Sequence, residues 1–195
     1  MSSAILTLRT VVAPRSSALA YSLFIVGGTS FIAIMAQISL PVPGSPVPVT
    51  GQTLAVLLVG TTYGAALGAA TFSTYLLAGI AGAPVFAGGT YGIDRVLGAT
   101  GGYLFGMLLA SAVLGYLAER RADRNFTTSF PALLLGSLII FTFGLVWLHF
   151  SLDLTWAKTV SMGLAPFIVG EVLKVAIVAT SLPLVWRKIS EKLDK

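Results

Sequence analysis

Apolar residues fill most of this chain, and charged residues interrupt them only rarely. Five stretches carry no charged side chain, apart from Glu171 and Lys174 in the last, and they cover 16–52, 53–93, 96–118, 125–148 and 159–186. A helix needs roughly 20 mostly apolar residues to cross the hydrocarbon core of a bilayer. The pattern therefore predicts a series of membrane-spanning helices.

Proline and glycine indicate where these helices end. Four prolines within 41–48 remove backbone donors and fix φ, so this segment is predicted to be a loop. The glycine-rich stretch 79–102 also predicts an ordered loop, and Tyr63-Gly64 offers a hinge in a block about twice the length of one span. Helices are accordingly expected at about 17–40, 52–61, 63–79, 101–120, 130–150 and 165–187.

Composition supports the membrane assignment and excludes several other classes. Hydrophobic residues make up 56% of the chain, charged residues 10%, and the mean hydropathy is +0.92. Average soluble domains contain roughly 25% charged residues, so an ordinary soluble enzyme is excluded. The net charge of +5 comes from 12 basic residues spread too thinly for a nucleic-acid groove. Without cysteine, and with His149 as the one histidine, no metal site or other cofactor is expected.

The basic residues are divided unevenly between the two ends of the predicted helices. Nine lie on one side and only Arg95 and Lys158 on the other; the nine are Arg9, Arg15, Arg120, Arg121, Arg124, Arg187, Lys188, Lys192 and Lys195. Basic residues accumulate on the cytoplasmic side of membrane proteins. Both termini are therefore predicted to be cytoplasmic, and the loops 41–51, 80–100 and 151–164 to face outward.

These observations predict the fold class and the location. The chain is expected to be an all-α integral membrane protein of the cell membrane, with six transmembrane helices in a compact bundle. A short cytoplasmic segment, 1–16, would precede the helices and a basic tail would follow them, so that 1–195 forms a single membrane domain. The charged run 119–124 is interpreted as an anchor at the cytoplasmic membrane surface.

Glu171 and Lys174 are the two charges inside a predicted span. Ionisable residues at membrane depth are costly and usually belong to a functional site. Their i, i+3 spacing places both on one helix face, at a depth that a pocket open to the outside would reach. The alternative interpretation is a charged pair that only holds neighbouring helices together.

Polar and aromatic residues in the outer loops are the second set of candidates. A small-molecule pocket is mostly apolar and contains a few placed polar groups, which this set would supply. The alternative is an aromatic belt at the membrane interface. The set consists of Thr50, Gln52, Phe86, Thr90, Tyr91 and Tyr103. Asp94 and Arg95, by contrast, are interpreted as a solvated loop pair.

Small residues recur at a spacing of four in three places. The series are Gly60, Gly64, Gly68; Gly98, Gly102, Gly106 with Ala110; and Ala18 with Ser22. Such faces let helices approach closely. Packing inside the chain and docking on a partner protein both remain open for them. No phosphate-binding loop, H-E-x-x-H or G-x-S-x-G motif occurs, so ligand binding is favoured over ATP hydrolysis or proteolysis.

Four motifs in the right order resemble the BioY family, the biotin-binding S components of energy-coupling factor (ECF) vitamin transporters. They are PVPVTGQT at 46–53, GIAGAPVFAGG at 79–89, GGYLFG at 101–106 with GYLAE at 115–119, and PFIVGEVLK at 166–174. The resemblance implies a six-helix bundle that binds biotin at its outer face under two loop lids. It also implies docking on a membrane coupling protein with two cytoplasmic ATPases, which would consume the ATP.

The resemblance also implies particular site residues. Glu171 and Lys174 align with an acid and a lysine that contribute to the family's substrate site, where the acid is usually aspartate. Thr90 takes the position of a polar residue, often asparagine, that is expected to touch the ligand. The predicted substrate-binding set is Glu171, Lys174, Thr90, Gln52, Tyr91, Tyr103 and Phe86. An S component for another vitamin, or a small intramembrane enzyme with Glu171 as general base, are the alternatives.

Overall fold

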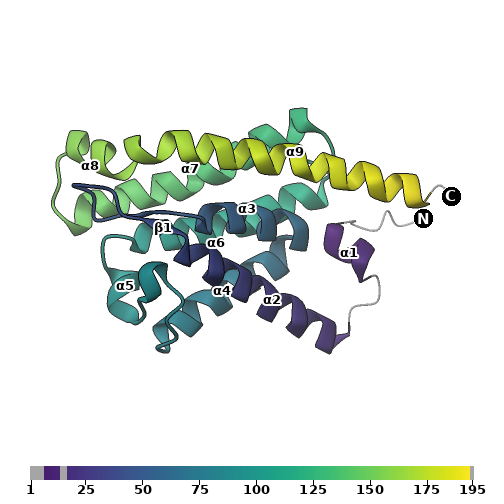
Figure 1. Cartoon of the computed structure of the whole chain (residues 1–195), viewed down its shortest axis with the longest axis horizontal. Helices are drawn as coiled ribbons and strands as arrows, with labels where there is room; N and C mark the ends of the chain where they lie inside the picture. Colours follow the sequence, from purple (N-terminus) through teal and green to yellow (C-terminus); the bar gives the residue numbers. More distant parts are fainter. Residues whose placement is uncertain (1–6, 14–16, 194–195) are drawn as a thin grey trace.

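The computed structural model describes residues 7–13 and 17–193, and over these ranges the chain is almost entirely helical (Figure 1). Its α-helices are α1 (Leu8–Val12), α2 (Ala18–Gln37), α3 (Gln52–Tyr63), α4 (Ala65–Ile80), α5 (Ile93–Leu97), α6 (Gly101–Glu119), α7 (Phe126–Ser151), α8 (Trp156–Gly163) and α9 (Ile168–Leu193). Two 3-10 turns, η1 (Ala87–Gly89) and η2 (Ala165–Phe167), and two short strands, β1 (Ser39–Leu40) and β2 (Val49–Thr50), complete it. Arg15 and Lys195, which entered the charge count, lie outside the described residues.

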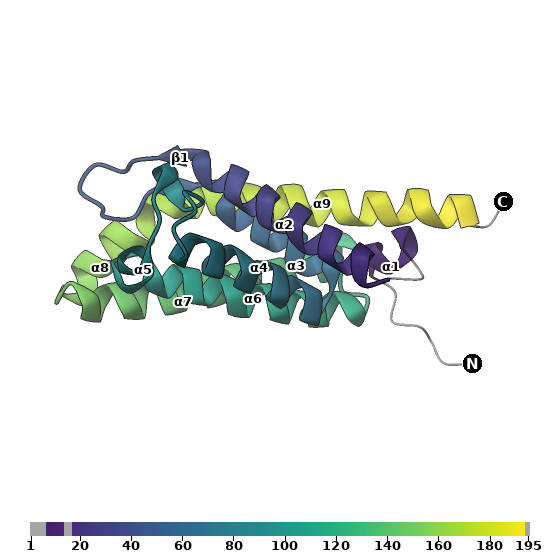
Figure 2. The same cartoon turned by 90° about the horizontal axis from the view of Figure 1, so that it is seen from below.

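The long helices run side by side along one axis, and the connecting loops collect at its ends (Figures 1 and 2). The proline-rich loop, α5 and α8 lie at one end, whereas α1 and the last turns of α9 lie at the other. Helix α2 ends at Gln37, earlier than predicted, because Ser39 and Leu40 pair with Thr50 and Val49 across the base of the proline-rich loop. Helix α9 in turn begins later than predicted, after η2, and continues to Leu193.

The break between α3 and α4 lies at Gly64, one residue beyond Tyr63. Gly64 has φ +88°, a left-handed conformation that glycine adopts at little cost. The Glu119 carboxylate accepts a hydrogen bond from the first amide of α4, Ala65 N–H, at 3.0 Å. A carboxylate at a helix N-terminus satisfies an orphan donor and interacts favourably with the helix dipole.

The charged run 119–124 is therefore more than a surface anchor. Besides Glu119, it contains Asp123, whose side chain is buried and accepts a hydrogen bond from the Trp186 indole. Arg124 lies over the same indole ring, 3.2 Å from its centroid. Burial raises the pKa of the Asp123 carboxyl above its ordinary value, although these two neighbours favour the charged form. The acidic residues of this run link the loop to α4 and α9.

Close helix packing at glycines builds the centre of the bundle. A Cβ on Gly60 would lie 2.8 Å from the Ser111 carbonyl oxygen, and a Cβ on Gly106 would lie 2.8 Å from Ile140 Cα. Both neighbours are backbone atoms of another helix, so these positions let α3 approach α6 and α6 approach α7. The series through Gly60 and through Gly106 thus serve packing inside the chain, whereas Ala18 and Ser22 are exposed.

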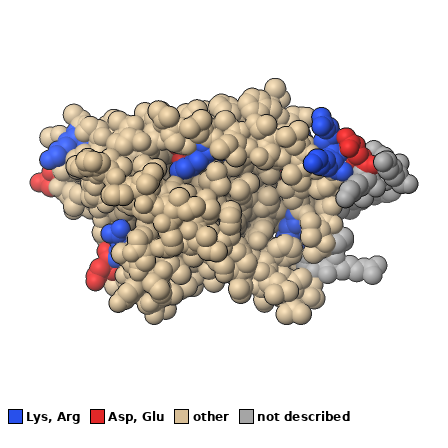
Figure 3. Space-filling view, in the orientation of Figure 1, with Lys and Arg blue, Asp and Glu red and all other residues tan. Residues whose placement is uncertain are grey.

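The outside of the bundle is apolar. Among the described residues, four helical segments are long and apolar enough to cross a membrane: α2, α6, α7 and the continuous segment from Trp156 to Glu191. Figure 3 shows most charged side chains toward the ends of the molecule, with a blue and red spot and a separate blue spot nearer the middle of the visible face. The chain is a multi-pass membrane protein.

Candidate functional site

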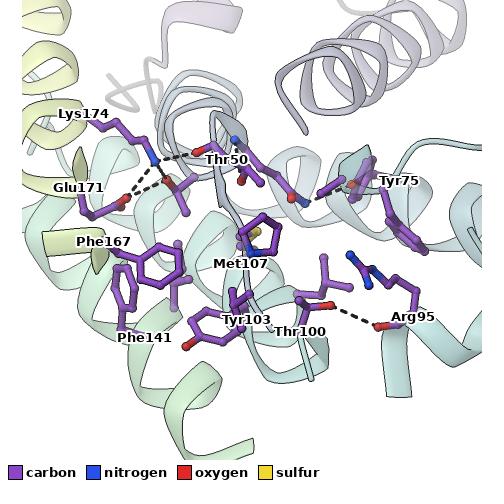
Figure 4. Close-up of a pocket in the computed structure, with 18 residues that line it drawn as sticks. Thr50, Tyr75, Arg95, Thr100, Tyr103, Met107, Phe141, Phe167, Glu171 and Lys174 are labelled. Carbon is purple, nitrogen blue, oxygen red and sulfur yellow. Dashed lines mark hydrogen bonds and ion pairs between the residues drawn. The ribbon is translucent and has the colours of Figure 1, made fainter. Parts of the chain in front are cut away.

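A cavity opens among α3, α4, α6, α7 and α9 at the end of the bundle that carries the proline-rich loop. Together with its mouth and the open solvent there, it spans about 610 Å³ not occupied by protein atoms. Its walls are largely apolar and aromatic, and Figure 4 shows Tyr103, Met107 and Phe167 among them. The polar groups in the lining come from segments far apart in the sequence, between Thr50 and Lys174.

Glu171 and Lys174 form an ion pair in the cavity wall, with Nζ 3.4 Å from Oε2. Only 6% of Glu171 is exposed, and both of its oxygens accept hydroxyl hydrogen bonds. Ser137 of α7 donates to Oε1 at 2.7 Å, and Thr53 of α3 donates to Oε2 at 2.8 Å. A buried charge is tolerated when it is paired and hydrogen-bonded in this way. Three helices therefore hold the carboxylate in place.

All three N–H donors of the Lys174 ammonium have an acceptor within the protein. It donates to Thr50 O at 2.7 Å and to Thr53 Oγ1 at 2.8 Å, besides its contact with Glu171. Thr50 ends β2, just before α3, so no helical amide uses its carbonyl. Thr50 pairs with Ser39 of β1, and its carbonyl accepts from Lys174 of α9. An ammonium has three donors, and all three are used inside the protein.

A second polar chain runs along the opposite wall. The Gln52 amide donates to the Tyr75 hydroxyl at 3.2 Å, and this hydroxyl donates to Val85 O at 3.1 Å. Phe86, next in the chain, is 2% exposed and packs edge-on against Tyr75. It also fills the space beside Gly79, where a Cβ would meet the Phe86 ring at 2.2 Å. The loop after α4 thereby presents Phe86 to the cavity.

The predicted site residues divide into two groups. Five of them line the cavity: Gln52, Phe86, Tyr103, Glu171 and Lys174. Tyr103 contributes its ring, since its hydroxyl donates to Gly163 O at 2.8 Å. Thr90 and Tyr91 lie outside the lining: the Thr90 hydroxyl donates to Ala87 O within its own loop, and Tyr91 is 62% exposed. For Tyr91 the position agrees with the interfacial alternative.

Sequence patterns did not reveal several residues of the site: Thr53 and Arg95 line the cavity, and Ser137 bonds Glu171 without belonging to the lining. Thr53 and Ser137 are hydroxyl residues within apolar helices, a weak signal that many lipid-facing positions share. Arg95 was interpreted as half of a solvated pair with Asp94, and this is wrong for Arg95: its side chain lines the cavity from α5. Among the described residues, no ion pair joins it to Asp94. The loop between α4 and α6 turns α5 toward the cavity.

In Figure 4 the Glu171–Lys174 pair and Arg95 lie on different sides of the cavity, with Met107 and Tyr103 between them. The lining thus contains two cationic side chains and one anionic one. This distribution, enclosed by aromatic walls, suits a small amphipathic ligand with one negative charge and several hydrogen-bonding groups.

A multi-pass helical bundle with such a cavity near one end is a membrane-embedded ligand-binding protein. The sequence model of the BioY family matches residues 9–191, and this chain belongs to the BioY family. It is 36% identical to the biotin transporter BioY2 of Lactococcus lactis over 162 residues, which cover 81% of this chain and 86% of that protein. It is also 36% identical to the biotin transporter BioY of Thermotoga maritima, with 77% and 86% covered.

A solved structure has the same fold. The crystal structure, at 2.1 Å, of the S-component for biotin from an ECF-type ABC transporter superposes with a TM-score of 0.79. The superposition covers 87% of this chain and 92% of that one, at 22% sequence identity. The helical arrangement is therefore shared even though most side chains differ.

Proposed function

We propose that this chain is the biotin-binding S subunit of an ECF-type transporter. It would take up biotin from the outer side of the cell membrane and deliver it inward. A membrane coupling protein and two cytoplasmic ATPase subunits would supply the energy from ATP. Membership of the BioY family and the likeness to biotin transporters support this, and the single observation that carries it is the cavity with its mixed charges.

The proposed topology has six spans and two cytoplasmic termini. Helices α2, α3, α4, α6, α7 and α9 would each cross the membrane, with α3 the shortest. An even number of crossings agrees with α1 and the end of α9 lying at one end of the bundle (Figures 1 and 2). That end also carries most of the basic residues, which favours the cytoplasm. The cavity then opens to the outside.

The charges of the cavity suggest how biotin is oriented. The Lys174 ammonium has no donor left for a ligand unless its internal bonds break. The Arg95 guanidinium lines the cavity, and within the described residues no hydrogen bond or ion pair engages it. A guanidinium binds a carboxylate with two parallel hydrogen bonds. We therefore place the biotin carboxylate at Arg95 and the ureido ring near Glu171, whose remaining lone pairs can accept its N–H groups.

Equilibrium binding of radiolabelled biotin to the purified protein in detergent tests this proposal. The wild type is expected to bind biotin more tightly than the uncharged biotin amide. The variant Arg95→Ala should bind biotin about 10- to 100-fold more weakly, because a charge-assisted hydrogen bond contributes about 1.5–3 kcal/mol. It should bind the amide almost as the wild type does, so that the preference for biotin disappears.

The variant Lys158→Ala is the matched control, since Lys158 is an exposed cation of α8 outside the cavity lining. It should leave both affinities unchanged. Absence of biotin binding to the wild type would contradict the proposed function. An equal loss for biotin and amide in Arg95→Ala would contradict the proposed orientation alone.

Two alternative functions were an S component for another vitamin and a small intramembrane enzyme. An S component for another vitamin predicts that this vitamin displaces labelled biotin at a lower concentration than biotin itself. Competition with a panel of water-soluble vitamins distinguishes the two. The enzyme alternative is not retained, because the family relatives are transporters.

A further inference from the structure

Gln37, the last residue of α2, uses its side-chain amide to hold a loop that is distant in the sequence. Its Nε2 donates to Val85 O and Phe86 O, each at 3.2 Å, and its Oε1 accepts from Gly89 N–H at 2.9 Å. Ala33 O, in the same helix, lies 3.1 Å from Nε2, so the two N–H donors of the amide are shared among three carbonyl oxygens. An exposed glutamine is ordinarily solvated, whereas this one links α2 to the loop 81–92.

That loop forms one wall of the cavity. It supplies Phe86 and Ala87 to the lining. Its backbone contains Gly82, Gly88, Gly89 and Gly92 at positive φ, between +68° and +105°. Glycine loses more conformational freedom on ordering than other residues, so such a loop needs external contacts to keep one shape.

Two side chains provide those contacts from opposite sides of the loop. Tyr75 bonds Val85 O from inside the bundle, and Gln37 bonds the same carbonyl from the end of α2. Gln37 alone also reaches Phe86 O and Gly89 N–H, which flank the cavity-lining residues. Packing against Tyr75 holds the Phe86 ring, whereas Gln37 holds the backbone on both sides of Ala87.

We propose that Gln37 is a positioning residue of the ligand cavity, which fixes the loop 81–92 as a wall without touching the ligand. The proposal rests on the proposed function of that cavity. Loss of the amide would let the loop move away, so bound ligand would leave faster.

The variant Gln37→Met tests the proposal, because methionine has a similar length and no strong donor or acceptor. Biotin should dissociate about tenfold faster from Gln37→Met than from the wild type, which corresponds to the loss of one or two neutral hydrogen bonds. Gln37→Glu should be at least as damaging, since its carboxylate faces the Val85 and Phe86 carbonyl oxygens. Ser30→Ala, at another exposed position of α2, is the control and should dissociate like the wild type.

Hydrogen exchange of the ligand-free protein provides a readout that does not depend on biotin. Amide protons of 81–92 should exchange faster in Gln37→Met, while those of the middle of α2 should not change. Unchanged exchange in the loop would overturn the proposal, as would a lowered melting temperature with unaltered loop exchange, which indicates a purely structural role in α2. If the wild type fails to bind biotin, the proposed function fails, and the loop exchange still decides the role of Gln37.

Discussion

At the scale of single residues, the cavity depends on one buried ion pair. Glu171 and Lys174 neutralise each other, and the Thr53 hydroxyl lies between them as donor to one and acceptor from the other. Removing one partner leaves a buried charge without compensation, which costs more than removing both. Single and double variants of this pair therefore separate its contribution to stability from its contribution to ligand binding.

Lys174→Met should lower the free energy of unfolding by about 3 kcal/mol, because the Glu171 carboxylate loses its counter-ion. The double variant Glu171→Gln/Lys174→Met should recover most of this loss. Biotin binding should be weakened in both variants, because the Glu171 carboxylate is either replaced or no longer held by Lys174. Chemical denaturation in detergent, followed by the fluorescence of the three tryptophans, measures the stability. Lys158→Met serves as the control. Wild-type stability of Lys174→Met would show that the pair is not coupled as described.

At the scale of elements, the glycine series determine how closely the helices pack. The spacing of four indicated close approach but left open which helix approaches. Gly106 lies against the backbone of Ile140 in α7, whereas Gly27 of α2 has no atom within 4 Å of its Cβ position. Two glycines in long apolar helices thus have opposite environments.

Gly106→Ala should destabilise the protein by about 2 kcal/mol, because backbone atoms cannot move aside as a side chain does. For a chain of this length, that change corresponds to a decrease in Tm of roughly 4–8 °C. Gly27→Ala is expected to leave Tm unchanged or to raise it, since alanine favours helix over glycine. Thermal unfolding of both variants in the same detergent makes the comparison. Equal Tm values for the two would refute the packing role of Gly106.

At the scale of the whole molecule, delivery of the ligand would require a surface for the coupling protein. Ala18 and Ser22 form an exposed small-residue stripe at the end of α2 opposite the cavity. Gly60 and Gly106 are buried, whereas Ala18 and Ser22 are exposed in the part of the chain that the structure describes. A partner helix can approach such a stripe and would be kept away by bulky groups.

Replacement of Ala18 and Ser22 by tryptophan should leave biotin affinity unchanged and abolish uptake into cells that also produce the partner subunits. Leu23→Trp is the control, because Leu23 is 65% exposed and points about 100° away from Ser22 around the helix. Normal uptake by the Ala18→Trp/Ser22→Trp variant would exclude this stripe as the docking surface.

The sequence by itself determined the class of the protein, most of its helices and the charged pair of its site, Glu171 and Lys174. Long apolar runs, prolines and glycines act locally, so they can be interpreted without tertiary contacts. The cost of charge in an apolar helix is also local, and it was enough to identify Glu171 and Lys174.

Only the tertiary structure decided the rest of the site. Thr53 and Ser137 lie 118 and 34 residues from Glu171 in the sequence, and Gln37 lies 48 residues from Val85. Arg95 enters the cavity through the turn of its loop, which no periodicity describes. In a membrane helix the lipid side is as apolar as the packed side, so the pattern of residues does not reveal which face meets another helix. Which residues meet across a helix contact is therefore decided by the tertiary structure.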